Sequence, residues 1–135
     1  AIAAQSGESP RRVRASLERV PIEPLDSVVS RLGLTQVDFV KIDVEGAEAR
    51  VIAGAPHVLG KLRPVLLLEV NDKALRAQGN CAETLLETLR DKIGYEIFVF
   101  SSATGLLEPW HTGDALSANV VAIPTERVAE TVTAS

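Results

Sequence analysis

Apolar and polar residues follow one another with a spacing that changes several times along the first half of the chain. They alternate over residues 13–22, which predicts a strand. From Leu25, apolar residues fall at positions 25, 28, 29 and 32, which predicts an amphipathic helix that Gly33 ends. A mostly apolar strand is predicted over residues 37–43. Beyond it the spacing becomes helical again and predicts a helix over residues 46–59.

The second half of the chain continues this order of elements. Residues 64–70 are nearly all apolar, which is typical of a strand buried on both faces of a parallel sheet. A helix is predicted over residues 81–91, and strands over 95–100 and 117–123. Residues 104–118 are interpreted as a loop, and the residues after Pro124 as a mobile tail. The order predicts an α/β fold with a mostly parallel sheet, in which the last strand returns antiparallel.

Composition limits the classes of function. The 135 residues suit one domain with a real core, and the net charge of −4 argues against a nucleic acid or an anionic membrane as partner. The longest apolar run, residues 64–68, is too short to span a bilayer. Cys81 has no second cysteine to pair with, which favours a reducing compartment, and we expect a cytoplasmic protein. The sequence contains no methionine, which allows it to be a piece of a longer protein.

Candidate chemistry begins where the strand over residues 37–43 ends. Three carboxylates and a glycine lie within six residues there, namely Asp43, Glu45, Gly46 and Glu48. Open α/β sheets bind ligands in the crevice beyond the carboxyl ends of their strands, so Asp43 and Glu45 are the first candidates. Gly46, which has no Cβ, would let the turn approach a ligand closely, although it also suits an ordinary turn.

The alternation of side chains along strands extends this site. Lys41 and Asp43 share one strand face, and Glu69 and Asn71 share a face of the next strand. If the two strands are parallel neighbours, these four side chains converge near the carboxyl edge of the sheet. Two interpretations remain open. In the functional one, Asp43, Glu69 and Asn71 bind a hydroxyl-bearing substrate or Mg²⁺, because oxygen donors suit that ion.

The other interpretation is structural. Glu45 and Glu48 would stabilise the first turn of the following helix, and Lys41 would be a buried counter-ion for Asp43. His111, beside Trp110 in the last predicted loop, is a candidate general base, with an exposed loop histidine as the alternative. His57 is interpreted as a surface or packing residue, and Cys81 is assigned no chemistry.

Several stretches together resemble the FkbM family of S-adenosylmethionine-dependent methyltransferases. The most specific stretch is Lys-Ile-Asp-Val-Glu-Gly-Ala-Glu within residues 37–48, and the resemblance covers roughly residues 18–124. The other matching stretches are Val-Pro-Ile-Glu-Pro-Leu-Asp at residues 20–26, Val-Ile-Ala-Gly-Ala at 51–55, Arg63-Pro64 with Glu69, and Asn-Val-Val-Ala-Ile-Pro at 119–124.

The resemblance implies a Rossmann-like sheet of seven strands with helices on both faces. Residues 37–43, 64–70, 95–100 and 117–123 would be its fourth, fifth, sixth and antiparallel seventh strands. The implied reaction is methyl transfer to a hydroxyl oxygen of a sugar, a polyketide or another small molecule. Asp43 or Glu45 would orient or deprotonate the hydroxyl, Lys41 and Glu69 would set the charge of the site, and His111 would be a reserve base.

The sequence departs from the family in its first residues. The glycine-rich cofactor loop and the acidic residue that holds the ribose have no counterpart here, so the residues that bind the cofactor remain unknown. We therefore expect three parts: a loop remnant at 1–17, the C-terminal half of the methyltransferase domain at 18–124, and a tail at 125–135. Such a chain should bind S-adenosylmethionine weakly and be inactive when isolated.

The missing half would leave residues 37–43 as an exposed apolar edge of the sheet, which favours a homodimer or strand exchange. One alternative is a non-catalytic α/β module that completes its sheet with a partner chain. A weaker alternative is another Rossmann-like enzyme, such as a nucleotide-sugar enzyme, which would also need the absent loop.

Overall fold

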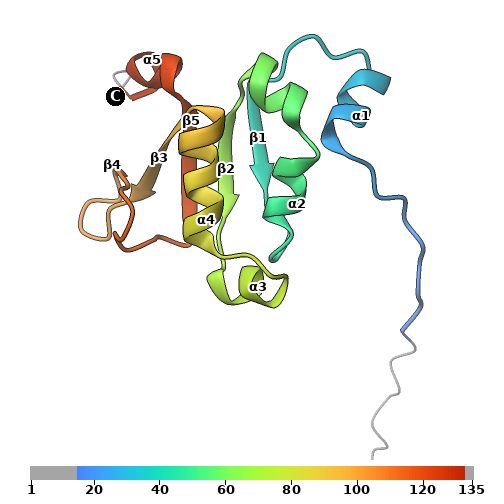
Figure 1. The fold of residues 1–135 in the computed structure, drawn as a ribbon, viewed down its shortest axis with the longest axis horizontal. Helices are drawn as coiled ribbons and strands as arrows, with labels where there is room; N and C mark the ends of the chain where they lie inside the picture. The colour runs from blue at the N-terminus through green and yellow to red at the C-terminus, as the bar shows by residue number, and fades with distance from the viewer. Residues whose placement is uncertain (1–14, 133–135) are drawn as a thin grey trace, which may run out of the picture.

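A five-stranded sheet with the order β1-β2-β5-β3-β4 forms the centre of the computed structural model, which describes residues 15–132 (Figure 1). β1 pairs with β2 in parallel, whereas β5 lies antiparallel between β2 and β3, and β4 is antiparallel to β3. The strands are β1 (Phe39–Ile42), β2 (Val65–Glu69), β3 (Tyr95–Phe100), β4 (Leu107–Pro109) and β5 (Asn119–Pro124). The α/β class and the antiparallel last strand are confirmed. The strands β1, β2 and β3 run in the same direction, as predicted. Because β5 lies between β2 and β3, β1 and β2 are the one parallel pair among the described residues.

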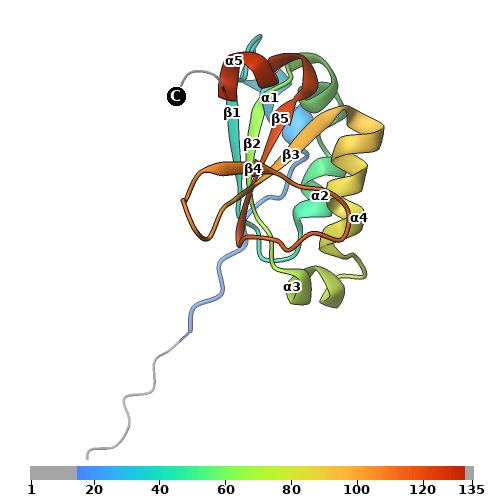
Figure 2. The same ribbon diagram turned by 90° about the vertical axis from the view of Figure 1, so that its left-hand side faces the viewer.

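Helices pack mainly on one face of this sheet, where Figure 2 shows α2 and α4 side by side. The larger core lies between that face and the helices, and it includes Val29 of α1, Ile52 of α2, Leu75 of α3 and Leu86 of α4. A smaller core on the other face includes Phe98 and Val121, against which Val128 of α5 packs. The helices are α1 (Leu25–Arg31), α2 (Glu48–Ala53), α3 (Asp72–Ala77), α4 (Ala82–Glu87) and α5 (Val128–Val132), with shorter helical segments η1 (Val58–Leu62), η2 (Thr88–Ile93) and η3 (Thr125–Arg127). Within residues 15–132, no helix has the length and apolar character needed to cross a membrane.

The continuous helix predicted over residues 46–59 is wrong, because the chain breaks it into α2 and η1. α2 ends at Gly54, whose carbonyl oxygen accepts a hydrogen bond from the backbone N–H of Asp26. The Asp26 carboxylate in turn accepts the backbone N–H groups of His57 at 2.7 Å and Val58 at 2.9 Å. Asp26 therefore supplies the acceptors at the start of a new helical turn, as a capping residue does, from 31 residues away.

Two short elements before Pro124, α3 and β4, form where none was predicted. α3 follows β2 directly, and its first turn is capped by the Asn71 side chain, whose oxygen accepts the backbone N–H of Ala74 at 3.1 Å. β4 lies inside the predicted loop and pairs with β3. The strand predicted over residues 13–22 is wrong where the structure describes it, because residues 15–24 have no regular secondary structure, and Val13 lies outside the described residues.

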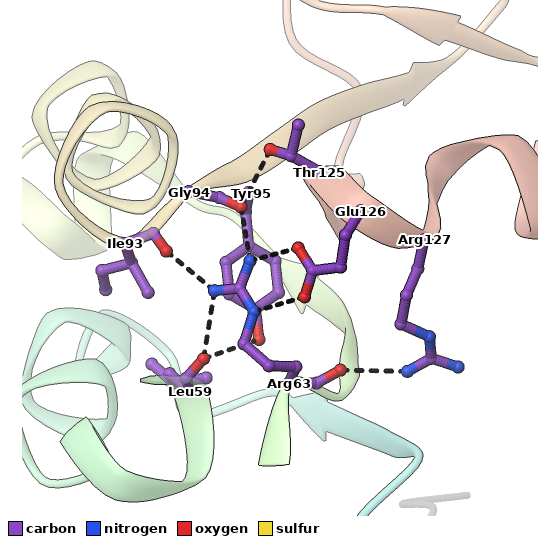
Figure 3. A network of polar contacts seen from close by, with 8 residues as sticks. All are labelled: Leu59, Arg63, Ile93, Gly94, Tyr95, Thr125, Glu126 and Arg127. Atoms are coloured by element: carbon purple, nitrogen blue, oxygen red, sulfur yellow. Dashed lines mark hydrogen bonds and ion pairs between the residues drawn. The ribbon is translucent and has the colours of Figure 1, made fainter. Parts of the chain in front are cut away.

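Residues 125–132 are helical rather than a mobile tail, and a network around Arg63 binds the first of them (Figure 3). Residues 133–135 of the predicted tail lie outside the described residues. The Arg63 guanidinium binds the Glu126 carboxylate through two hydrogen bonds of 2.7 Å. It also donates to the carbonyl oxygens of Leu59 at 3.3 Å and of Ile93 and Gly94 at 2.8 Å each. We call these residues the Arg63 network. It joins the ends of η1 and η2 to η3, which follows the last strand.

The Arg63 network also shifts the ionisation of two of its neighbours. Hydrogen bonding to Arg63 lowers the pKa of Glu126 to about 2. The guanidinium lies over the ring of Tyr95, 4.9 Å from its centroid, and burial raises the pKa of the Tyr95 hydroxyl to about 12. At neutral pH, Glu126 is therefore ionised and Tyr95 is neutral.

Candidate functional site

A polar cavity of about 330 Å³ lies at the carboxyl ends of β1 and β2, where Figure 1 shows α3 below the sheet. It is lined by Asp43, Glu45, Glu69, Asn71 and Ala74. The parallel register, in which Ile42 lies opposite Leu68, brings the residues that follow each strand to the same edge. The structure therefore brings Asp43, Glu45, Glu69 and Asn71 together as predicted, and their roles stay a prediction.

The turn from β1 to α2 forms one wall of this cavity in an unusual backbone conformation. Glu45 has a φ of 48° and Gly46 a φ of 102°, so two consecutive residues lie in the region of positive φ. Gly46 is buried, and a Cβ built on it would lie 2.6 Å from the carbonyl oxygen of Ala74. Gly46 does not line the cavity. Gly46 instead packs closely against the backbone of α3, so the turn and α3 are in direct contact beside the cavity.

Asn71 and Glu69 form the opposite wall. The Asn71 side-chain oxygen is engaged in capping α3, so its amide NH₂ is the group that can donate into the cavity. Glu69 ends β2 opposite Asn119 of β5. The lining therefore offers carboxylate acceptors from three residues and an amide donor from one. This set suits a ligand that carries several hydroxyl donors.

Lys41 lies beside the cavity rather than in it. Its Nζ is 3.7 Å from a carboxylate oxygen of Asp43, so the two residues share a face as predicted. Both side chains are exposed, which makes the pair weak, and the interpretation of Lys41 as a buried counter-ion is wrong. Lys41 lines a separate groove along β1. The charged residues that line the cavity itself are all acidic.

The geometry does not support the magnesium hypothesis. Within residues 15–132, no three His, Cys, Asp or Glu side chains lie close enough together to hold a metal ion. Asp43, Glu45 and Glu69 line the same cavity, but they do not form such a group.

His111 lies far from the cavity. It follows β4, which is the strand at the edge of the sheet opposite β1. Its backbone N–H donates to Asp114 at 2.9 Å, and its Nδ1 lies 3.3 Å from the same carboxylate oxygen in an exposed turn. The structure therefore does not bring His111 together with the other predicted site residues.

The sequence predicted Glu48 only as a residue that stabilises the start of a helix, and its burial beside the site was missed. Glu48 is only 1% exposed and is the one charged residue that is buried among the described residues. Its Oε1 accepts the backbone N–H of Gly46 at 3.2 Å, and its Oε2 is buried without a hydrogen-bond partner among the described residues. A signal was present, because Glu48 stands four residues before Ile52 and seven before Ala55, on the buried stripe of the helix.

An apolar groove of about 590 Å³ runs along β1, between α2 and the residues that lead into α1. Val40 and Ile42 of β1, Val51 of α2 and Leu25 of α1 are among the residues that line it. β1 is an edge strand of the described sheet, and the side chain of Phe39 at its start is 56% exposed. The predicted apolar edge is therefore confirmed.

Comparisons with known proteins show the family to which this chain belongs. The family model of the methyltransferase FkbM domain matches residues 1–97, a range that includes the residues interpreted as a loop remnant and ends within β3. The AMB antimetabolite synthetase AmbE of Pseudomonas aeruginosa is 38% identical over 93 residues, which are 68% of this chain and 4% of that protein. This chain thus spans a small part of the relative's length. No solved structure matches it. Because the family model matches well over half of its residues, the chain belongs to the methyltransferase FkbM domain family.

Proposed function

We propose that this chain forms the acceptor side of an S-adenosylmethionine-dependent O-methyltransferase that acts on a hydroxyl group of a sugar or another small molecule. The observation that carries the proposal is the acidic cavity at the carboxyl ends of β1 and β2 in a chain of the FkbM family. The relative named as an antimetabolite synthetase favours a small-molecule acceptor that is handled within a larger biosynthetic protein.

The described residues do not fit a complete cofactor site. Within residues 15–132, no strand runs into a glycine-rich turn, and the space beside Gly46 is filled by the backbone of Ala74. S-adenosylmethionine supplies an electrophilic methyl group wherever it is bound. We propose that strands outside this chain complete a Rossmann-like sheet and hold it, and that residues 1–135 alone are inactive.

The cavity residues are suited to handling the acceptor. Methylation of a hydroxyl requires that its oxygen be held in place and that its proton leave as the new bond forms. Asp43 or Glu45 would accept the hydroxyl hydrogen bond and take the proton. Glu69 and the Asn71 amide would hold further hydroxyl groups of the same molecule. The Asp43 side chain is exposed, so solvent can carry the proton away.

Replacing Asp43 with asparagine tests this role. In the complete natural protein, assayed with a panel of hydroxylated small molecules, we expect kcat/KM of Asp43→Asn to fall by about 100-fold or more, because asparagine cannot take the proton. The melting temperature should stay the same, since Asp43 makes only a weak exposed ion pair. Asp91→Asn is the matched control, because Asp91 is an exposed, ion-paired aspartate far along the chain. Turnover by Asp43→Asn equal to that of the control would contradict the role.

A second candidate function is supported by the free edge of β1. We propose that two copies of this chain, or the chain and a partner, pair through this edge and bury the apolar groove beside it. Sedimentation of residues 1–135 should show a dimer that Phe39→Lys converts to a monomer, since a charge on an edge strand opposes pairing. Leu106→Lys, also at an exposed position, should remain dimeric. A monomer at every concentration would contradict pairing between two copies and leave pairing with a different partner chain as the form of the proposal.

A further inference from the structure

From the turn that joins β1 to α2, we infer that Glu48 is a positioning residue: its buried carboxylate fixes this turn and so aims Asp43 and Glu45 at the polar cavity. The inference rests on the proposed function only for its consequence in catalysis. The positioning itself is a property of the described residues, and it can be tested without any substrate.

The hydrogen bond that Glu48 accepts restrains the backbone directly after Glu45, and so the direction of the Glu45 side chain. The N–H of Gly46 belongs to the peptide group that joins Glu45 to Gly46, and it donates to Glu48 Oε1 at 3.2 Å. Fixing this peptide group fixes the backbone on the carboxyl side of Glu45. Glu45 itself has a φ of 48°, a region that residues other than glycine seldom adopt. The strained residue is therefore held by contacts on both sides of Gly46, with Glu48 on one side and Ala74 on the other.

The same carboxylate is costly to the fold. Oε2 is buried without a partner among the described residues, and a buried polar atom in that state lowers stability. A glutamate that only favoured the helix start through the dipole could do so from an exposed position, as Glu83 does in the first turn of α4. Backbone strain and a buried, incompletely bonded carboxylate thus occur in one turn, beside the cavity. Strained backbone and unsatisfied buried groups of this kind are concentrated at functional sites, where the surrounding structure holds them in place.

Two variants of Glu48 separate positioning from simple stabilisation. Glu48→Gln keeps an oxygen that can accept from Gly46, whereas Glu48→Met has a similar length and no such oxygen. In residues 1–135, we expect Glu48→Met to speed hydrogen exchange of the Gly46 amide at least about tenfold relative to the Ile42 amide. The carboxyl carbon resonances of Asp43 and Glu45 should move with it. Glu48→Gln should keep both close to the original. Glu83→Met, the matched control, should change neither.

Activity provides the second measurement. In the complete natural protein, Glu48→Met should lower kcat for methyl transfer by about tenfold or more, and Glu48→Gln should restore it to within a few-fold of the original. A purely structural role would lower melting temperature and activity together, and it would leave kcat unchanged at a temperature where Glu48→Met is still fully folded.

Three results would overturn the inference. The first is a Gly46 amide that stays protected in Glu48→Met. The second is a Glu48→Gln variant that loses protection as fully as Glu48→Met. The third is a normal kcat in a variant whose Gly46 amide has lost protection. If Glu48→Met does not fold, Glu48→Gln still tests the inference. Its Gly46 amide must then remain as protected from hydrogen exchange as in the original protein, and a loss of protection would overturn the inference. If the exchange results agree and even the original protein transfers no methyl group, the proposed function fails while the positioning role stands.

Discussion

Replacing Gly46 with alanine is expected to lower the free energy of unfolding by about 3 kcal/mol. Two costs add at this position. The φ of 102° is unfavourable for any residue with a Cβ, and the new Cβ would lie 2.6 Å from the oxygen and 2.7 Å from the carbonyl carbon of Ala74. Those atoms belong to the backbone of α3, which cannot move aside as a flexible side chain would. Urea denaturation of residues 1–135 measures the loss, provided that the slope of the unfolding free energy against urea concentration is the same for both proteins.

Two other glycines serve as matched controls for Gly46→Ala. Gly33 also has a positive φ, but an added Cβ meets no atom within 4 Å, so Gly33→Ala isolates the backbone cost of about 1 kcal/mol. Gly60 has neither a positive φ nor a close neighbour, and Gly60→Ala should be neutral or slightly stabilising. If Gly46→Ala lowers the free energy of unfolding no more than Gly33→Ala does, then α3 does not pack closely enough on the turn to exclude a Cβ.

Replacing Arg63 with alanine should be the second large destabilisation, by about 2–4 kcal/mol. The Arg63 side chain is 19% exposed, and its loss leaves the Glu126 carboxylate and the carbonyl oxygens of Leu59, Ile93 and Gly94 without this donor. Arg63→Lys should not restore stability, because one ammonium group cannot span the same acceptors. Thermal unfolding followed by circular dichroism measures both variants. Arg31→Ala, which breaks an exposed 2.7 Å pair with Glu23, is the control and should cost less than about 0.5 kcal/mol.

Acid provides a further check on the Arg63 network. The folded pKa of Glu126 is about 2, below its ordinary value of 4.5, so the pair contributes stability above pH 4.5 and loses it as the pH falls toward 2. Glu126→Gln should therefore be less stable than the original at pH 7 and approach it near pH 2. Because the Glu126 side chain is 55% exposed, we expect a difference of only about 1 kcal/mol at pH 7. A difference that stays constant across this range would contradict the assignment.

Elements with a local signal were predictable from the sequence, and elements that depend on distant contacts were not. The strand over residues 95–100 has the predicted bounds, because a run that is apolar except for Glu96 follows Gly94. The helix over residues 46–59 failed because its break depends on Asp26, which lies 31 residues before His57 and is brought there only by the fold. α3 carried a local signal, the capping Asn71, that was interpreted as chemistry alone.

The candidate site shows the same division. Side-chain alternation was enough to place Asp43, Glu69 and Asn71 around one cavity, because parallel neighbours share their carboxyl edge. The position of His111 depends on the order of the strands in the sheet. The order of the strands along the chain does not show that β4, which precedes His111, lies at the edge opposite β1. The burial of Glu48 could be predicted from its place on the apolar stripe of α2, whereas its hydrogen bond with the N–H of Gly46 depends on a turn of positive φ that the sequence pattern does not specify.

The place of β5 in the sheet has a consequence for how the chain is made. β5 is the last strand along the chain, yet it lies inside the sheet and supplies the hydrogen bonds that join β2 to β3. A nascent chain that has reached only residue 97, where the family match ends, therefore has two strand edges facing water and no strand between them. Open edges of this kind attract other chains. Because β5 joins β2 to β3, we expect the two parts of the sheet to come together only once the chain up to Pro124 has left the ribosome.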